Sequence, residues 1–176
     1  SKGLHADLRL QDYRDTQDGP FDAVCSIEMF EAVGQAYWPT YFKAVHELLK
    51  PGGRACIQTI TIHDDVFERY SRSTDFIQQY IFPGGMLPSP SVFRAEARRA
   101  GLEVVQEHAF GPDYAETLRR WRLRMLENAH IILAAGYPES LLRTWEWYLA
   151  YCEGGFAEGY LGVAQLVFAR PGAAVS

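Results

Sequence analysis

Two carboxylates follow a short apolar run near the start of the chain. Glu28 and Glu31 come just after residues 21–26, an apolar run behind a turn signal that predicts a strand buried on both faces of a parallel sheet. Open α/β sheets bind ligands beyond the carboxyl ends of their strands. The two acids are therefore candidates for an active-site wall. The alternative is that both lie in the solvated first turn of the next helix.

Composition limits the classes of protein and site. The 176 residues are 48% hydrophobic and 22% charged, which predicts one globular domain with a sizeable core. The formal net charge of −5 argues against broad nucleic-acid binding, so no nucleic-acid partner is expected. Cys25, Cys56 and Cys152 lie far apart and are odd in number, which predicts reduced, buried thiols in a cytoplasmic protein. Neither a disulfide framework nor a metal site is expected.

The first half of the chain predicts strands that alternate with a helix. Residues 6–10 alternate as a short first strand, and residues 54–62 are rich in β-branched residues, as buried strands are. Between them, residues 37–49 carry an apolar stripe at helical spacing, and the Lys-Pro-Gly-Gly turn ends this helix. Successive strand–helix–strand units predict a parallel, doubly wound α/β sheet.

The second half predicts a long loop and then two strands separated by a helical insert. Residues 63–90 are assigned to the loop, because their Pro- and Gly-rich end cannot form regular structure. The other predicted elements are a helix over 93–100 capped by Ser91, a strand over 102–108, helices over 113–135 and 139–152, the second ended by Gly154 and Gly155, and a strand over 162–169. The insert, about residues 113–152, is expected to cover one edge of the sheet.

Five short segments carry a resemblance to a known family. They are Gln-Asp-Tyr-Arg-Asp at 11–15, Ser-Ile-Glu-Met-Phe-Glu-Ala-Val-Gly at 26–34, Leu-Lys-Pro-Gly-Gly at 49–53, Tyr-Ile-Phe-Pro-Gly-Gly at 80–85 and Phe-Gly-Pro-Asp-Tyr at 110–114. Together they resemble the cyclopropane-fatty-acyl-phospholipid synthase family, which includes the mycolic acid cyclopropane synthases. The resemblance covers nearly the whole chain and implies a Rossmann-like class I methyltransferase fold.

The resemblance also implies a reaction. Such an enzyme transfers a methylene group from S-adenosylmethionine to a cis double bond in the acyl chain of a membrane phospholipid. An alkene is a poor nucleophile, so it must be held in line with the methyl group in a dry apolar tunnel. Methyl transfer leaves a carbocation, which needs nearby negative charge and a base that removes a proton. In the family that base is thought to be a bound bicarbonate ion.

Four residues take site roles from the resemblance. Glu31 is implied to hydrogen-bond the bicarbonate, Ile60 to do so through its backbone amide, and Tyr114 to close the site. A solvated helix turn remains the alternative for Glu31, and ordinary core for Tyr114 and Ile60. Gln58 stands where well-studied members carry histidine; it can donate a hydrogen bond to an anion but cannot carry a proton-linked charge. This leaves a cyclopropane and a methyl branch both open as products.

Cofactor binding is implied at the ends of the first two strands. Asp12 would accept a hydrogen bond from the adenine amino group and Tyr13 would stack nearby, with a surface turn as the alternative. The backbone of Ser26 and Ile27 would run beside the methionine part of the cofactor. No Gly-x-Gly-x-x-Gly occurs. The chain is therefore expected to be the carboxyl-terminal part of such an enzyme, with a sheet incomplete at its N-terminal side and no turnover alone.

Surface features suggest partners. The arginines at 119, 120, 122 and 124 form either a solvated helix face or a docking site for anionic headgroups, which would place the protein at the inner membrane face. Residues 82–90 either line the acyl entrance or plug the core. An exposed edge strand favours a homo-oligomer. The competing functions are methylation of a soluble small molecule and a non-catalytic methyltransferase module.

Overall fold

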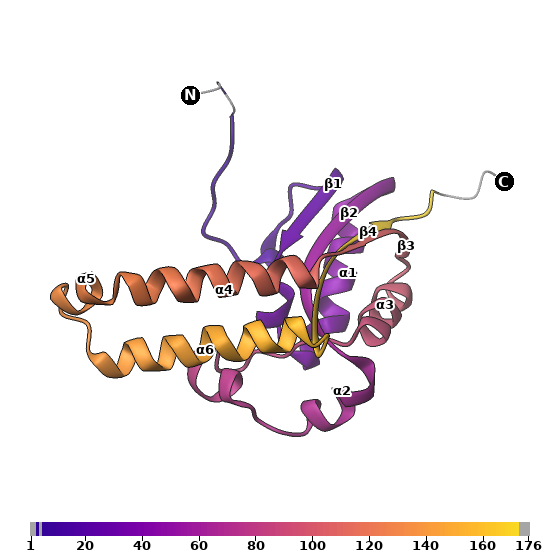
Figure 1. Cartoon of the computed structure of the whole chain (residues 1–176). Coiled ribbons are helices and arrows are strands. Elements are labelled where there is room, and N and C mark those ends of the chain that lie inside the picture. Colours follow the sequence, from indigo (N-terminus) through magenta and orange to yellow (C-terminus); the bar gives the residue numbers. More distant parts are fainter. Residues whose placement is uncertain (1–2, 4, 173–176) are drawn as a thin grey trace.

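A four-stranded mixed sheet forms the body of the protein in the computed structural model, which describes residues 3 and 5–172 (Figure 1). The strands are β1 Phe21–Ile27, β2 Leu49–Ile62, β3 Glu103–Ala109 and β4 Leu161–Ala169, in the order β1-β2-β4-β3. β1 and β2 are parallel and joined through α1 Trp38–Leu48, as predicted. These four strands were predicted from the sequence, as was the α/β class, and β2 is longer than predicted.

The prediction of a parallel sheet holds for β1 and β2 but is wrong for β4, which runs antiparallel to both of its neighbours. β3 leads into α4 Gly111–Glu127, and α6 Glu139–Ala157 leads back to β4. The chain thus leaves the sheet and returns to it at the same edge, as Figure 1 shows. A strand that starts where its predecessor ended has to run in the opposite direction.

The predictions for residues 6–10 and for β1 also need correction. Residues 6–10 pair with no strand in the described part of the chain, and Leu8 and Leu10 are 91% and 109% exposed. β1 is an edge strand, and most of its residues are exposed, whereas a strand buried on both faces was predicted. The predicted buried thiols hold for Cys152 but not for Cys25, which is exposed on β1. An apolar sequence shows that a strand can be buried, not that another element covers it. No described element covers the edge formed by β1.

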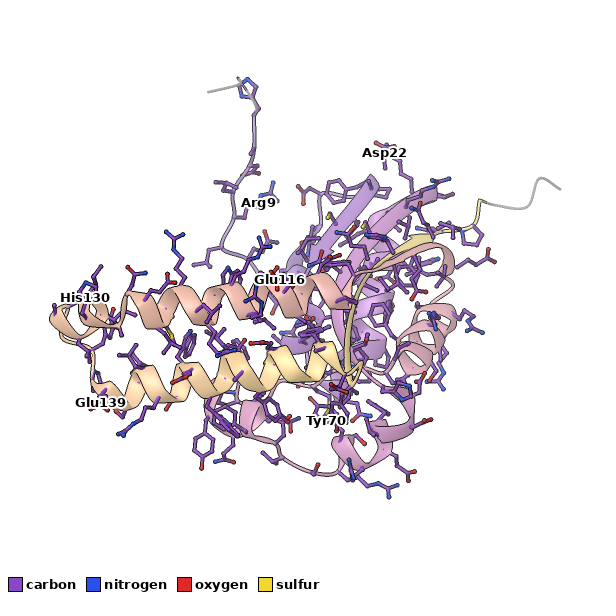
Figure 2. All side chains as sticks on the ribbon, in the orientation of Figure 1. Arg9, Asp22, Tyr70, Glu116, His130 and Glu139 are labelled. Atoms are coloured by element: carbon purple, nitrogen blue, oxygen red, sulfur yellow. The ribbon has the colours of Figure 1, made fainter. Side chains whose placement is uncertain are left out.

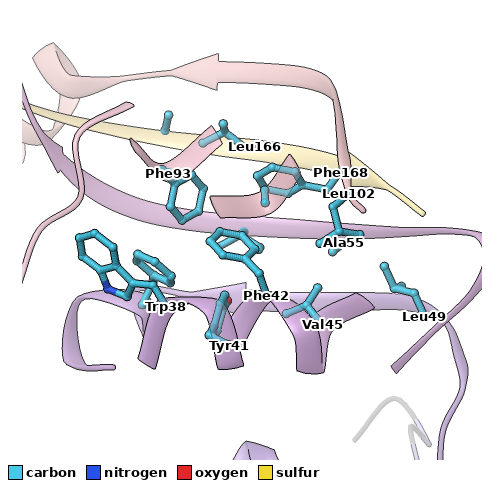
Figure 3. Packing of buried hydrophobic residues seen from close by; sticks show 14 residues of the cluster. Trp38, Tyr41, Phe42, Val45, Leu49, Ala55, Phe93, Leu102, Leu166 and Phe168 are labelled. Carbon is cyan, nitrogen blue, oxygen red and sulfur yellow. The ribbon is translucent and has the colours of Figure 1, made fainter. Parts of the chain in front are cut away.

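The core lies between α1, the sheet and α3 Pro90–Arg99 (Figure 3). Phe30 is fully buried at its centre, with ring centroids 4.8 Å from Phe93 and 5.3 Å from Trp38. The apolar stripe predicted for α1 is confirmed, since its residues are buried in this cluster. α3 begins at Pro90, three residues earlier than predicted, because its cap is Ser89 and not Ser91. The Ser89 hydroxyl accepts from the Val92 amide at 3.4 Å.

Helices α4 and α6 pair as a long arm that projects from the body, with the short α5 Ala129–Ala134 near its far end (Figure 1). Figure 2 shows Glu116 on the sheet-side half of α4 and His130 and Glu139 towards the tip. The predicted helix over 113–135 is broken at Asn128, which caps α4 and α5. α6 continues past Gly155 to Ala157. A Cβ at position 155 would lie 2.9 Å from the Leu161 side chain. That glycine therefore allows close packing and does not end the helix.

The segment between β2 and α3 is more ordered than the predicted loop. It contains α2 Asp64–Ser71 and a π-helical turn, Ile77–Ile81. His63 caps α2, since its Nδ1 accepts from the Asp65 amide at 3.3 Å, and the buried Tyr70 hydroxyl accepts from the Leu87 amide at 3.2 Å. Helix caps and hydrogen bonds between distant residues of this segment give order to a stretch whose composition favours turns. No described helix is both long and apolar enough to cross a membrane.

Candidate functional site

A cavity of about 910 Å³ lies where β2, the arm and the segment before α3 meet. Its lining is mainly apolar and aromatic, and it includes Met86 and Leu87 from the loop that was a candidate for the acyl entrance. Glu28, Glu31 and Tyr114 are among its lining residues. The size suits an organic ligand, since ligand sites are largely apolar clefts with a few placed polar groups. The cavity therefore has the composition that an apolar substrate requires.

Glu31 lies in a 3-10 turn, Phe30–Ala32, that buried Phe30 anchors in the core. Its Oε1 accepts hydrogen bonds from the Ile60 backbone amide at 2.5 Å and from the Thr59 hydroxyl at 3.0 Å. Its Oε2 is buried and has no partner among the described residues. Burial raises the pKa of Glu31, and the nearby charge of Glu28 adds to the effect, against the lowering influence of the hydrogen bonds. The Glu31 carboxyl is therefore fixed through Oε1, while Oε2 makes no hydrogen bond with the described residues.

The raised pKa of Glu31 predicts a pH dependence of stability. A carboxyl whose pKa is raised in the folded state binds its proton more tightly there than in the unfolded chain. Its stabilising contribution is fully present below the unfolded value, near 4.5, and is lost as pH rises through the folded pKa. Urea unfolding at stepped pH should therefore show Glu31→Gln gaining stability relative to the unchanged protein as pH rises from acid to neutral. Parallel pH profiles for the two proteins would contradict this.

Tyr114 opens the arm in the first turn of α4 and reaches back to the end of β1. Its hydroxyl donates to the Glu28 carboxylate, 3.2 Å from each oxygen, and its ring packs 4.7 Å from that of Phe156. Burial raises the pKa of Tyr114 further above its ordinary value, and the charge of Glu28 adds to this. The group is thus a neutral phenol that donates a hydrogen bond. The sequence left Tyr114 as either a core residue or a site residue. Its ring is half-buried, and its polar end lies at the cavity.

Gln58 faces the same carboxylate from β2. Its Nε2 donates to Glu28 at 2.8 Å, and its Oε1 accepts from Gln165 Nε2 at 3.0 Å. The structure therefore brings Glu31, Gln58, Ile60 and Tyr114 into one cluster, although 83 positions separate Glu31 from Tyr114 in the printed sequence. Glu28, which the sequence offers only as a candidate for the active-site wall, joins this cluster as well. The available signal was its place at the strand end, which it shares with Glu31.

The four expected cofactor residues lie apart from the cavity lining. Asp12 caps a 3-10 turn, Tyr13–Asp15, and binds the Arg14 guanidinium at 2.7 Å, which lowers the pKa of Asp12 to about 2. Tyr13 packs edge-on against Tyr41 with centroids 5.6 Å apart. At the end of β1 the Ser26 hydroxyl is buried without a partner among the described residues, and Ile27 is 53% exposed.

These residues fit an S-adenosylmethionine site in part. The buried Ser26 hydroxyl suits a polar group of the cofactor, which would compete with the nearby Tyr41 hydroxyl for it. The Asp12 carboxylate suits an amino group, but it would have to share its oxygens with Arg14. Within residues 3 and 5–172, no group of three His, Cys, Asp or Glu side chains is placed to hold a metal ion.

Comparison with known proteins gives consistent matches. A family model described as mycolic acid cyclopropane synthetase matches residues 2–166. Tuberculostearic acid methyltransferase UfaA1 of Mycobacterium tuberculosis is 43% identical over 97% of this chain and 40% of its own length. Cyclopropane-fatty-acyl-phospholipid synthase of Escherichia coli K12 is 38% identical over 96% of this chain and 42% of its own. This chain thus spans about two fifths of the length of these curated relatives.

The solved structures agree with the sequence relatives. Mycolic acid cyclopropane synthase CmaA1, in complex with SAH and CTAB, superposes with a TM-score of 0.79 at 30% identity, over 89% of this chain and 57% of that one. The cyclopropane synthase MmaA2 of Mycobacterium tuberculosis superposes with a TM-score of 0.77 at 25% identity, over 87% of this chain and 56% of that one. The predicted class I methyltransferase fold is thereby confirmed over the matched part.

Proposed function

This chain belongs to the mycolic acid cyclopropane synthetase family, and we propose that it holds the acyl-chain side of the active site of an S-adenosylmethionine-dependent enzyme. The substrate is an unsaturated phospholipid acyl chain, and the product is a cyclopropane fatty acid. The observation that carries the proposal is the large apolar cavity, which meets a cluster of carboxylate, phenol and amide groups at the end of the sheet.

In this reaction the cofactor supplies an electrophilic methyl group, and the chain's residues do the rest. The apolar lining holds the alkene away from water, which keeps the reacting carbon aligned and the cation from hydrolysis. Glu31 lines the cavity, where its negative charge would stabilise a carbocation. Ser26, Ile27, Asp12 and Tyr13 are the residues that would hold the cofactor.

A bicarbonate ion is the base in this proposal. Bound beside the cavity, it would supply a base for a proton of the newly added methyl group, and the electron pair of that C–H bond would close the three-membered ring. The buried Oε2 of Glu31, which has no partner among the described residues, can accept the hydrogen bond that the hydroxyl of bicarbonate donates. Tyr114, Gln58 and the Ile60 amide are the donors in reach. An anion bound here would lie beside the cavity that takes the alkene.

Labelled methyl transfer tests the function. Full-length protein is incubated with methyl-labelled S-adenosylmethionine and unsaturated phospholipid vesicles, with and without added carbonate. We expect label in the acyl chains, more of it with carbonate, and chromatographic analysis to show a ring. Label as a methyl branch would mean that Gln58 changes the outcome of the cation. Label only in soluble acceptors would contradict the lipid substrate.

Contact with a lipid surface is part of the proposal. Large apolar side chains are exposed along the arm, among them Trp121 at 57% and Trp147 at 58%. The arginine cluster supports headgroup binding less directly, because Arg119 and Arg120 both bind Glu116 and Arg122 binds Glu153. Apolar side chains of this size favour the membrane interface. Offering the same lipid in vesicles and in detergent micelles tests whether a bilayer raises the rate.

A further inference from the structure

Each donor that the proposed anion needs already donates to a carboxylate of this chain. The Ile60 amide donates to Glu31, while the Tyr114 hydroxyl and the Gln58 amide donate to Glu28. The Gln58 oxygen is itself held by Gln165, which fixes the NH₂ of Gln58 towards Glu28. An ionised carboxylate only accepts hydrogen bonds. Glu28 therefore accepts from both donors, Gln58 on β2 and Tyr114 on α4. An external anion would therefore compete with Glu28 for the single O–H of Tyr114 and for the N–H of Gln58 that Glu28 already accepts.

The backbone holds Glu28 in place for this role. Its φ is 50°, and it is the one non-glycine residue with positive φ in the described part of the chain. This left-handed conformation costs a residue with a side chain about 1 kcal/mol. The Glu28 amide also donates to the Gln58 carbonyl at 2.9 Å, which ties the strained residue to β2. Strain that surrounding contacts maintain at the edge of a cavity points to a function of the residue.

We propose that Glu28 is a built-in competitor of the bicarbonate-type anion and so sets how much anion the site requires. This inference rests on the proposed function. The anion can take the Tyr114 O–H, and the N–H of Gln58 that Glu28 accepts, only when the Glu28 carboxylate gives them up. Like charges a few ångströms apart also repel, and the repulsion is weakened but not removed by solvent. Glu28 is itself exposed, so its side chain has water to turn into when an anion arrives.

Two substitutions at position 28 separate charge from geometry. Glu28→Gln removes the charge and keeps the size. Glu28→Gly frees both donors and relieves the positive φ, which glycine adopts without penalty. Glu116→Gln is the matched control, because it removes a carboxylate from the exposed side of α4 where it binds only arginines. Glu28 acts here through Tyr114 and Gln58, so it is a positioning residue and needs a readout at Tyr114.

The first readout is independent of turnover. Full-length protein is labelled at tyrosine Cζ, the Tyr114 signal is assigned with Tyr114→Phe, and bicarbonate is titrated at constant ionic strength by NMR. We expect the bicarbonate Kd to fall by roughly tenfold in Glu28→Gln and Glu28→Gly, the order expected for removing a nearby like charge. Glu116→Gln should leave it unchanged. Binding no tighter in the two position-28 variants, or detectable in none of the proteins, would overturn the inference.

The second readout is the carbonate dependence of methyl transfer by full-length protein. The carbonate concentration for half-maximal rate should fall by roughly tenfold in Glu28→Gln, in step with the NMR titration. Loss of turnover at every carbonate concentration would show that Glu28 takes part in the chemistry and would overturn the competitor role. Absence of transfer by the unchanged protein counts against the proposed function instead, and the NMR titration then decides the inference alone.

Discussion

Glu31→Gln is expected to lower the rate of methyl transfer by the full-length protein by about a hundredfold or more, the size of effect seen when a charge-stabilising group is removed from an active site. Glutamine keeps the shape of the side chain, and its oxygen can still accept from the Ile60 amide and the Thr59 hydroxyl. What it loses is the negative charge and the titratable proton at the buried Oε2. The loss should therefore appear in kcat more than in lipid binding.

Initial rates with labelled S-adenosylmethionine, together with thermal unfolding, measure this effect. The unfolding temperature of Glu31→Gln at neutral pH should be no lower than that of the unchanged protein, since the ionised carboxyl is disfavoured by burial. Glu116→Gln serves again as control and should keep its rate. A Glu31→Gln enzyme that retains most of its activity would remove Glu31 from the chemistry and reduce it to a link between the 3-10 turn and β2.

The position of Glu31 could be predicted from the sequence, because it depends on local features. A carboxylate just past a strand of an α/β sheet lies at the edge where ligands bind, and the motif around residues 29–34 adds a family role. The sequence also places Tyr114 at the start of a helix, and the structure has it in the first turn of α4. Both predictions required only the positions at which a strand ends and a helix begins. Turn residues and apolar periodicity indicate these positions well.

Glu28 and the direction of β4 could not be predicted in the same way. The role of Glu28 depends on side chains 30 and 86 positions away, and no local pattern encodes a hydrogen bond at that separation. The direction of β4 depends on where the arm returns to the sheet, and a buried strand reads the same in either direction. Residues 6–10 show the opposite failure, because they alternate like a strand but have no described strand to pair with.

Phe30 connects the core to the site, and Phe30→Ala should be the most destabilising change at this edge. The side chain is 0% exposed and has four aromatic neighbours, which are Trp38, Tyr41, Phe42 and Phe93. Removing a buried phenylalanine leaves a cavity, so the free energy of unfolding should fall by about 3–5 kcal/mol. Urea unfolding measures it, with Val105→Ala, which is 51% exposed on β3, as the control of near-zero effect.

The comparison of Phe30→Ala with Glu31→Gln separates two ways of losing the site. The two residues are adjacent in one 3-10 turn, but one side chain is in the core and the other faces the cavity. Phe30→Ala should lose activity only as far as it unfolds or loosens the turn, and low temperature should restore part of it. Glu31→Gln should stay folded and inactive at every temperature. If Phe30→Ala unfolds no more readily than Val105→Ala, the aromatic cluster does not hold this turn, and the rigid placement of Glu31 needs another cause.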